Sequence, residues 1–528
     1  MYDADSPWVD PEIFNTLRPV LGICYGQHLI TQLLGGSVTK GDKGEFGLAT
    51  LNVDRPGRLF ANTAAQQQIW MSHRDVVAAL PGGFSVTATT ATCPVAAIED
   101  SARGLYGVQF HPEVVHTTHG RQLLSNFVFD ICGCGKDWDP KHRGPVVEEE
   151  IRQTVRDRNV FFFVSGGVDS TVAYTLCVRA LGKDRVRGVY VDTGLMREGE
   201  TGFVRRLFGD TVEIESAAAQ FLAPLAATCD PEEKRRVIGE QFVKVQERII
   251  ESRHLLDGHW ILGQGTIYPD TIESGGTLKA ALIKTHHNRV PGIQKLIESG
   301  HIVEPLSSFY KDEVREIGRE LDLPVEFLER HPFPGPGLAI RCLCSEFTLP
   351  LTRVQNNYLV PIRSVGVQGD SRSYAHALAM DRFPSAELNL QDEATELVNR
   401  TGDINRVIAR VDSVAALAEM QVQTSALTPE RIGLLRKADA LVRAISHESG
   451  FDRTVWQFPV VLIPLGTADA PDSVVLRPID SQDGMTARSV PMDDALLRRM
   501  ASELLAIEGI CGVFYDLTHK PPATIEWE

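Results

Sequence analysis

The sequence lacks an apolar run long enough to cross a membrane, and its N-terminus lacks a signal-peptide pattern. It also lacks a basic excess, because 53 Lys and Arg stand against 69 Asp and Glu and give a net charge of −16. Proteins that bind nucleic acid are usually basic. The nine cysteines are scattered and odd in number, which argues against a disulfide framework and favours a reducing compartment. We therefore expect a cytoplasmic protein with no membrane and no nucleic-acid partner.

Zinc-finger spacing is also missing, since Cys132-Gly-Cys134 and Cys342-Leu-Cys344 are too closely spaced. What remains is the composition of an ordinary globular protein, with 43% hydrophobic and 23% charged residues. A length of 528 residues is too great for one core and predicts about three or four domains. Because the chain is acidic, an anionic substrate must be held by local Lys and Arg side chains and by backbone N–H groups.

A glycine- and hydroxyl-rich turn follows the apolar run at 160–164, which predicts a strand buried on both faces. Apolar residues at helical spacing come next, so the turn lies at a helix N-terminus, where N–H groups and the helix dipole favour phosphate or pyrophosphate. No Walker Gly-Lys-Ser/Thr follows, and an ordinary strand-to-helix connection stays open. Asp169 could orient the loop or help to hold Mg²⁺. The candidate ligands for the phosphates are Ser165, Gly166, Gly167, Val168, Asp169 and Ser170.

A candidate nucleophile lies near the N-terminus, in Gly22-Ile23-Cys24-Tyr25-Gly26. The glycines permit a sharp strand-to-helix turn, and a helix N-terminus favours the thiolate form of Cys24. A strand expected at 106–110 delivers His111 and Glu113, which have the chemistry of a base and of the group that orients it. On residues alone, Cys24 can equally be a small buried side chain.

A second strand of the central region, expected at 187–191, ends in Asp192. Strand, helix and strand in this order predict a right-handed crossover and a parallel sheet, whose ligands bind beyond the carboxyl ends of the strands. Asp192 is therefore a further ATP candidate, although it could simply cap a turn. The run 264–274 is expected to line the same cleft, and three prolines and two glycines within 330–338 predict a fixed irregular loop.

The C-terminal region, about 345–528, contains an internal repeat. The segments 359–362 and 402–407 are echoed by 462–465 and 509–513. Each half is typical of an α+β unit with one long helix. The last nine residues, with two prolines and a tryptophan, suggest a tail pinned into a site.

The first 135 residues resemble the class I glutamine amidotransferases, in which a cysteine forms a glutamyl thioester and releases ammonia. The resemblance implies a triad of Cys24, His111 and Glu113, and Ser72-His73-Arg74-Asp75 looks like the Ser-His-Gly-Asp turn of that family. His28 stands where a glutamine is usual. In that family, further strands and a Gly-Gly-Pro turn open the domain. They would lie before Met1 and, judged from the usual size of the domain, would comprise about 60–70 residues. We therefore expect this chain to use ammonia, with little or no use of glutamine.

The rest of the chain resembles the N-type ATP pyrophosphatases and, more closely, the glutamine-hydrolysing GMP synthase family, through 165–170, 264–274, 284–288, 330–338 and 520–528. The resemblance implies ATP with Mg²⁺, XMP, and glutamine or ammonia as substrates. It implies a ligase that adenylylates XMP and aminates it to GMP. The implied lid residues are Lys284, His286 and His287, and the implied XMP contacts are Arg235, Asp370, Gln457, Lys520, Ile525 and Glu526. On residues alone, Arg235 could equally lie on a solvated helix face.

The expected fold is α/β throughout. It comprises an incomplete amidotransferase domain at 1–135, an ATP pyrophosphatase domain with a parallel sheet at 145–344, and an XMP-binding, dimerisation-type α+β domain at 345–528. Because two copies of the repeated unit could pack on each other, we expect a monomer rather than a homodimer. Two alternatives stay open. One is another ATP pyrophosphatase, such as an NAD synthetase, and the other is a truncated nucleotide-binding protein without catalytic activity.

Overall fold

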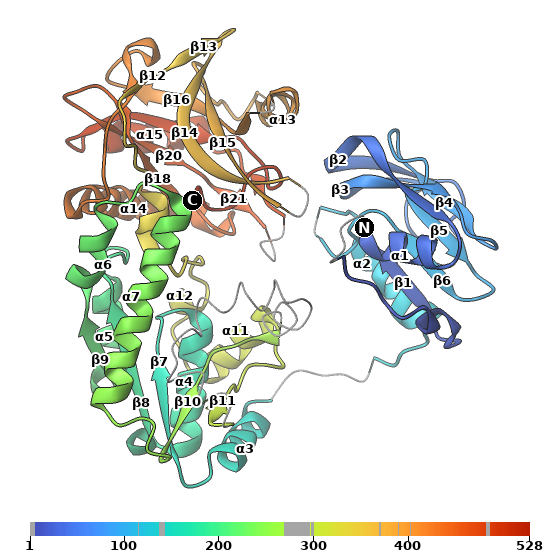
Figure 1. Cartoon of the computed structure of the whole chain (residues 1–528), viewed down its shortest axis with the longest axis horizontal. Coiled ribbons are helices and arrows are strands. Elements are labelled where there is room, and N and C mark those ends of the chain that lie inside the picture. Colours follow the sequence, from blue (N-terminus) through green and yellow to red (C-terminus); the bar gives the residue numbers. More distant parts are fainter. Residues whose placement is uncertain are drawn as a thin grey trace.

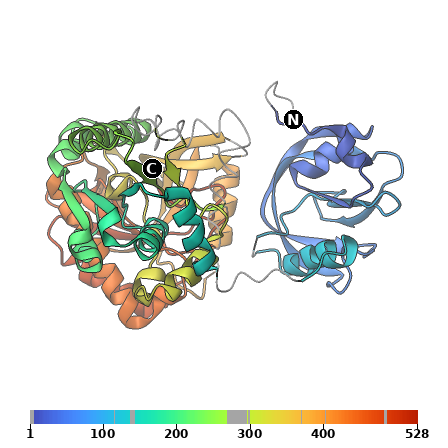
Figure 2. The same ribbon diagram turned by 90° about the horizontal axis from the view of Figure 1, so that it is seen from below.

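The computed structural model describes residues 6–114, 116–136, 143–268, 296, 300–368, 371–388, 390–401, 403–481 and 486–528. Of these, the described residues between 6 and 136 form one lobe, and the described residues from 143 onward form a second, larger body (Figures 1 and 2). Within the described residues, no helix is long and apolar enough to cross a membrane. The predicted lid, 284–288, and Asp370 lie outside the described residues.

The first lobe contains a six-stranded sheet in the order β1-β6-β5-β4-β2-β3. Strand β1 pairs in parallel with β6, and the other pairs are antiparallel. Its buried apolar side chains form clusters separate from those of the larger body. The elements are β1 (Val20–Ile23), α1 (Tyr25–Leu33), β2 (Ser37–Val53), β3 (Gln66–Ala79), β4 (Ser85–Thr89), β5 (Ala97–Asp100), β6 (Leu105–Val108) and α2 (Gly120–Ser125), with a 3-10 helix at Pro11–Asn15 and a π-helix at Asn126–Ile131.

The central domain contains a fully parallel five-stranded sheet in the order β11-β10-β7-β8-β9, as the strand-helix-strand pattern predicted. The apolar run becomes the middle strand, with Val160, Phe161 and Phe162 buried. The elements are α3 (Gly144–Val155), β7 (Asn159–Phe163), α4 (Val168–Leu181), β8 (Val186–Asp192), α5 (Glu200–Phe208), β9 (Val212–Ser216), α6 (Ala218–Leu225), α7 (Pro231–Ser252), β10 (Trp260–Gly263), β11 (Ile302–Val303), α11 (Lys311–Glu320) and α12 (Val325–Leu328).

The C-terminal domain is built on a seven-stranded sheet in the order β13-β14-β15-β16-β23-β20-β18. Its elements are β12 (Leu349–Pro350), β13 (Thr352–Val354), β14 (Asn357–Gln368), β15 (Ser371–Met380), α13 (Leu390–Arg400), β16 (Ile404–Ser413), β17 (Gln421–Val422), α14 (Pro429–Ser449), β18 (Val460–Ile463), β19 (Leu465–Gly466), β20 (Asp472–Leu476), β21 (Ile479–Asp480), β22 (Arg488–Ser489), α15 (Asp494–Leu505) and β23 (Ile510–Asp516).

This sheet contains the predicted repeat. In the first half, β14 pairs antiparallel with β15, and β15 pairs in parallel with β16 after the crossover helix α13. In the second half, β18, β20, α15 and β23 repeat the same order and directions. The two halves join through the antiparallel pair β16 and β23. Both halves of the repeat therefore pack on each other within one chain.

The central and C-terminal domains share one hydrophobic core. Phe161 and Val189 of the parallel sheet belong to the same buried cluster as Val442 of α14 and Val474 of β20. Arg436 of α14 also donates to the carbonyl oxygens of Gly194 and Met196, which follow strand β8. The loops at the carboxyl ends of the parallel strands are therefore held against the C-terminal domain.

Candidate functional site

The first candidate centre is the turn between β1 and α1. Cys24 has φ 49° and ψ −105° at the N-cap of α1, a strained conformation that is typical of a nucleophile elbow. A Cβ on Gly22 would lie 2.6 Å from the backbone of Gly26, so only glycine fits at position 22. A Cβ on Gly26 would meet no atom within 4 Å. The motif predicted both glycines, but packing requires only the first.

The predicted triad comes together around this turn. His111 Nδ1 lies 2.6 Å from Glu113 Oε1, and the backbone N–H of His111 donates to the Trp70 carbonyl oxygen at 3.0 Å. Burial alone would lower the pKa of His111, but hydrogen bonds with Cys24 and Glu113 outweigh burial and raise it to about 10. His111 thus lies between the candidate nucleophile Cys24 and Glu113, which is the arrangement in which a base activates a cysteine.

One further side chain, Gln109, and one main-chain carbonyl group, that of Ser72, contact Cys24. Gln109 Nε2 donates to Cys24 Sγ at 3.8 Å, and Gln109 Oε1 lies 2.7 Å from Nε2 of the buried His28. The Cys24 thiol also donates to the Ser72 carbonyl oxygen at 3.8 Å. Sequence reasoning did not find Gln109, although a polar residue in an apolar strand just before His111 was a usable signal. His28 acts as the support of Gln109.

The second candidate centre is the turn between β7 and α4. Gly166 has φ 76°, a conformation that favours glycine, and Gly167 caps α4. The Ser165 and Ser170 hydroxyl oxygens lie 2.9 Å apart, and the Gly167 N–H donates to Ser165 Oγ at 3.2 Å. The predicted hydroxyl-lined turn is therefore present at the N-terminus of a 14-residue helix, where an anion is favoured.

A lysine that sequence reasoning missed completes this turn. Lys311 Nζ, at the start of α11, lies 2.7 and 2.5 Å from the two carboxylate oxygens of Asp169. The residues are 142 positions apart, and a lysine at the start of a charged helix carries no local signal. A Cβ on Gly265 would lie 2.7 Å from the Ser170 backbone, so Gly265, which follows strand β10, packs directly against the turn. Gly265 thus agrees with the prediction that 264–274 lines the cleft, and 269–274 lie outside the described residues.

Asp192 lies at the carboxyl end of the neighbouring strand β8, as predicted. Its carboxylate accepts from the Gly194 N–H at 3.0 Å and from the Thr201 hydroxyl at 2.8 Å. Asp192 thus caps the turn, which was the structural alternative. The irregular loop at 330–336 is also found, and it ends in a 3-10 helix at Gly337–Arg341.

The third candidate centre surrounds the C-terminal tail. Arg341 is fully buried and donates to both carboxylate oxygens of Glu526, at 2.8 and 2.6 Å. Burial alone would raise the pKa of Glu526, but the Arg341 guanidinium outweighs burial and lowers it. Gln457 Nε2 donates to the same carboxylate at 3.3 Å. Two predicted XMP contacts, Gln457 and Glu526, are therefore neighbours.

The last residue of the tail is held by helix α7. The buried Lys234 Nζ lies 2.6 Å from Glu528 Oε2, and Arg235 donates to the main-chain oxygen of Glu528. Ile525 offers its carbonyl oxygen to Arg477 Nε at 2.9 Å. The tail is held in the fold, since Trp527 and Glu528 are buried, and that it enters a binding site stays a prediction. Arg235 thus binds the chain terminus rather than lying on a solvated face.

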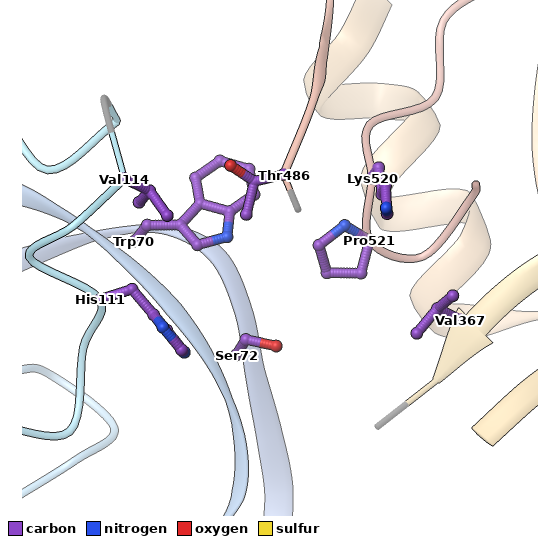
Figure 3. A pocket seen from close by; sticks show the side chains of 8 residues that line it. All are labelled: Trp70, Ser72, His111, Val114, Val367, Thr486, Lys520 and Pro521. Carbon is purple, nitrogen blue, oxygen red and sulfur yellow. The ribbon is translucent and has the colours of Figure 1, made fainter. Parts of the chain in front are cut away.

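Lys520 lines a cavity between the first lobe and the C-terminal domain. With Pro521, Val367 and Thr486 it lines one side of a cavity of about 110 Å³, and the first lobe lines the other side with Trp70, Ser72, His111 and Val114 (Figure 3). Thr486 Oγ1 also lies 3.3 Å from Nδ1 of His116 in the first lobe. The structure therefore brings Lys520 to the side of the first lobe that carries His111.

In comparisons with known proteins, three family models match three successive parts of the chain. A family model described as class I glutamine amidotransferase matches residues 3–131, one described as NAD synthase matches 145–222, and one described as GMP synthase C terminal domain matches 445–527. A probable glutamine-hydrolysing GMP synthase of Leptospira interrogans is 41% identical, over 100% of this chain and 90% of its own length. The GMP synthases of Thermobifida fusca and Streptomyces coelicolor are each 37% identical, over 100% of this chain and 88% of their own lengths.

A cysteine-nucleophile lobe joined to a parallel-sheet domain with a phosphate-type turn defines a ligase of the amidotransferase class, which forms C–N bonds with glutamine as amido donor. The NAD synthase family model matches only residues 145–222, around that turn. The GMP synthases match over the full length of this chain, and the family model of their C-terminal domain matches residues 445–527. The chain belongs to the glutamine-hydrolysing GMP synthase family.

Proposed function

We propose that this chain transfers the adenylyl group of ATP to the 2-oxygen of XMP, releases pyrophosphate, and lets ammonia displace AMP to give GMP. The observation that carries the proposal is the shared core of the central and C-terminal domains. This core includes Phe161 of β7, the strand that leads to the Ser165–Ser170 turn, and Ala339 and Cys342, which lie beside Arg341 in the sequence. Adenylylation turns a poor leaving oxygen into a good one, so the protein must mainly orient two anionic nucleotides and exclude water.

In this proposal, the turn binds the phosphates of ATP. Backbone N–H groups at the start of α4 and the hydroxyls of Ser165 and Ser170 donate to the departing pyrophosphate, and Lys311 offsets its charge. Asp169 supplies carboxylate oxygens, which are hard ligands of the kind that Mg²⁺ prefers, so it would hold the Mg²⁺ that accompanies ATP. The ion would neutralise negative charge on the pyrophosphate. Asp192, a further ATP contact in this proposal, caps the turn after β8 through the Gly194 N–H.

The XMP contacts are Arg235, Asp370, Gln457, Lys520, Ile525 and Glu526, with Lys284, His286 and His287 as the lid. Glu526 and Gln457 can bind ring or ribose groups, since one offers a carboxylate and the other an amide beside the loop 330–336. Arg235 would contact the XMP phosphate while it stays bonded to the chain terminus. Lys520 would reach XMP only by turning away from the cavity that it now lines.

Ammonia is supplied by Cys24, which attacks the glutamine amide while His111 carries the proton and Glu113 orients the imidazole. The Cys24 N–H donates to the Val108 carbonyl oxygen at 2.8 Å, and in a nucleophile elbow the oxyanion donor is the N–H of the following residue, here Tyr25. Loss of one oxyanion donor costs about 10²–10³ in rate. That this chain uses ammonia better than glutamine stays a prediction.

The test is the exchange of labelled pyrophosphate into ATP, which requires XMP if XMP is the acceptor. Gly265→Ala pushes a methyl group against the Ser170 backbone and should slow this exchange at least tenfold. Gly433→Ala is the matched control, because a Cβ there meets no atom within 4 Å, and its exchange should match the wild type. Exchange without XMP, or equal exchange in both variants, would contradict the proposed acceptor or the proposed site.

We further propose a cytoplasmic monomer. All nine cysteines are free thiols in the structure, which suits a reducing compartment. The two halves of the repeat in the C-terminal domain join where β16 pairs with β23 inside one chain. These two strands are therefore not open sheet edges at which a second copy of the chain could pair.

A further inference from the structure

Three side chains with metal-ligating atoms converge in the first lobe, apart from the candidate triad. Glu45 on β2 and His73 on β3 are direct partners across the antiparallel pair, and Cys93 lies between β4 and β5. One ligand atom of each lies within 4.8 Å of the other two, and among the described residues no other such trio of His, Cys, Asp or Glu occurs. His73 and Cys93 are buried, at 7% and 1% exposure.

The histidine has the orientation of a metal ligand. Its Nδ1 lies 2.9 Å from the Asp75 carbonyl oxygen, to which it donates, and this leaves Nε2 facing Glu45 and Cys93. Nε2 is buried without a hydrogen-bond partner and lies 3.4 Å from Glu45 Oε2. Bonds of about 2.0–2.1 Å to a tetrahedral Zn²⁺ place two such ligand atoms about 3.3–3.4 Å apart. The spacing is too long for a good hydrogen bond and fits a shared ion.

The other two ligands are also held from behind. The Thr90 hydroxyl donates to Glu45 at 3.1 Å and accepts from the Cys93 N–H at 2.9 Å, so one threonine ties both residues together. The Thr90 N–H donates to the Cys93 carbonyl oxygen at 2.9 Å. Ligands supported by such outer hydrogen bonds are the usual design of a protein metal site.

The three side chains offer one sulfur, one nitrogen and one oxygen ligand atom. Thiolate, imidazole and carboxylate together are a ligand set suited to zinc.

We propose that Glu45, His73 and Cys93 bind Zn²⁺, with a water molecule in the fourth position. Binding releases to solvent the thiol proton of Cys93 and the Nε2 proton of any protonated His73, and it forms one bond each to sulfur, nitrogen and oxygen. The ion ties β2 and β3 to the turn before β5. The carbonyl oxygen of Ser72, next to His73, accepts from Cys24, so the ion also steadies the strand behind the candidate nucleophile.

The test uses the full chain, stripped with a chelator and titrated with Co²⁺ alone. One equivalent should give a thiolate-to-cobalt absorption band that Zn²⁺ abolishes. Cys93→Ser should remove the band, and His73→Gln should weaken binding at least tenfold, while Cys24→Ser and Cys134→Ser should keep both. Circular dichroism checks the fold of each variant.

Absence of the band in the wild type, or its loss in Cys24→Ser instead of Cys93→Ser, would overturn the proposal. X-ray absorption of the zinc-loaded wild type needs no variant to fold. It should show one sulfur at about 2.3 Å and nitrogen or oxygen ligands at about 2.0–2.1 Å. No sulfur, or more than one, would also overturn the assignment.

Discussion

The buried carboxylate of Asp516, in β23, holds the C-terminal tail through two arginines and a tryptophan. It lies 3.0 Å from Arg406 Nη1 and 2.9 Å from Arg477 Nη1, and all three side chains have no exposed surface. Trp527 Nε1 donates to the same oxygen at 2.9 Å. The two guanidinium groups in turn donate to the Thr524 carbonyl oxygen. The Asp516 carboxylate is therefore the counterion of both arginines and, through them, holds the tail in position.

Asp516→Asn should therefore be strongly destabilising. The substitution keeps the shape but leaves two buried guanidinium groups without a counterion, and breaking a buried pair costs about 3–5 kcal/mol. For a domain of this size, each kcal/mol shifts the melting temperature by about 2–4 °C. Scanning calorimetry should show the transition of the C-terminal domain lowered by about 6–20 °C.

Asp412→Asn is the matched control, because Asp412 is exposed and accepts from the adjacent Ser413 N–H. Its free energy of unfolding should stay within about 0.5 kcal/mol of the wild type. If Asp516→Asn lost less than about 1 kcal/mol of stability, the carboxylate would not be the counterion that holds the tail.

Three further predictions concern other parts of the chain. Gly22→Ala should abolish glutamine-dependent activity while Gly26→Ala retains it, because only the first Cβ collides with backbone, and both variants should make GMP from ammonium chloride. Burial, with Arg477 and Arg488 nearby, lowers the pKa of His519 to about 4. Because the pKa of His519 is lower in the folded state than its unfolded value of about 6.5, its contribution to stability is fully present above pH 6.5 and is lost as the pH falls toward 4. Chemical denaturation should therefore show about 2 kcal/mol less stability at pH 5 than at pH 7.5. His519→Gln should remove that difference, and an unchanged pH dependence would contradict it. Sedimentation equilibrium should give the chain mass of 58.2 kDa, and twice that mass would contradict the monomer.

Local patterns in the sequence predicted the parts of the fold that short-range physics decides. The apolar run at 160–164 became the central strand β7, and the glycines after it formed the turn. The repeat in the C-terminal region appeared as two halves with the same strand order.

Contacts between distant residues could not be predicted in the same way. Lys311 reaches Asp169 only because α11 packs beside α4, and nothing in either local sequence indicates this. Arg406 and Arg477 resemble solvated charges in the sequence, yet they are fully buried around Asp516. Lys520, placed with the XMP contacts by resemblance, lines the cavity opposite His111, because the strand-like pairing of residue 520 with Ala487 directs it toward the first lobe.

The most direct test of the central claim is a side-by-side measurement of GMP formation from ATP and XMP, with ammonium chloride in one reaction and glutamine in the other. The account predicts one AMP and one pyrophosphate for each GMP with ammonium chloride, and a rate with glutamine about 10²–10³ lower. Formation of ADP, or no GMP with ammonium chloride while XMP still binds, would contradict it.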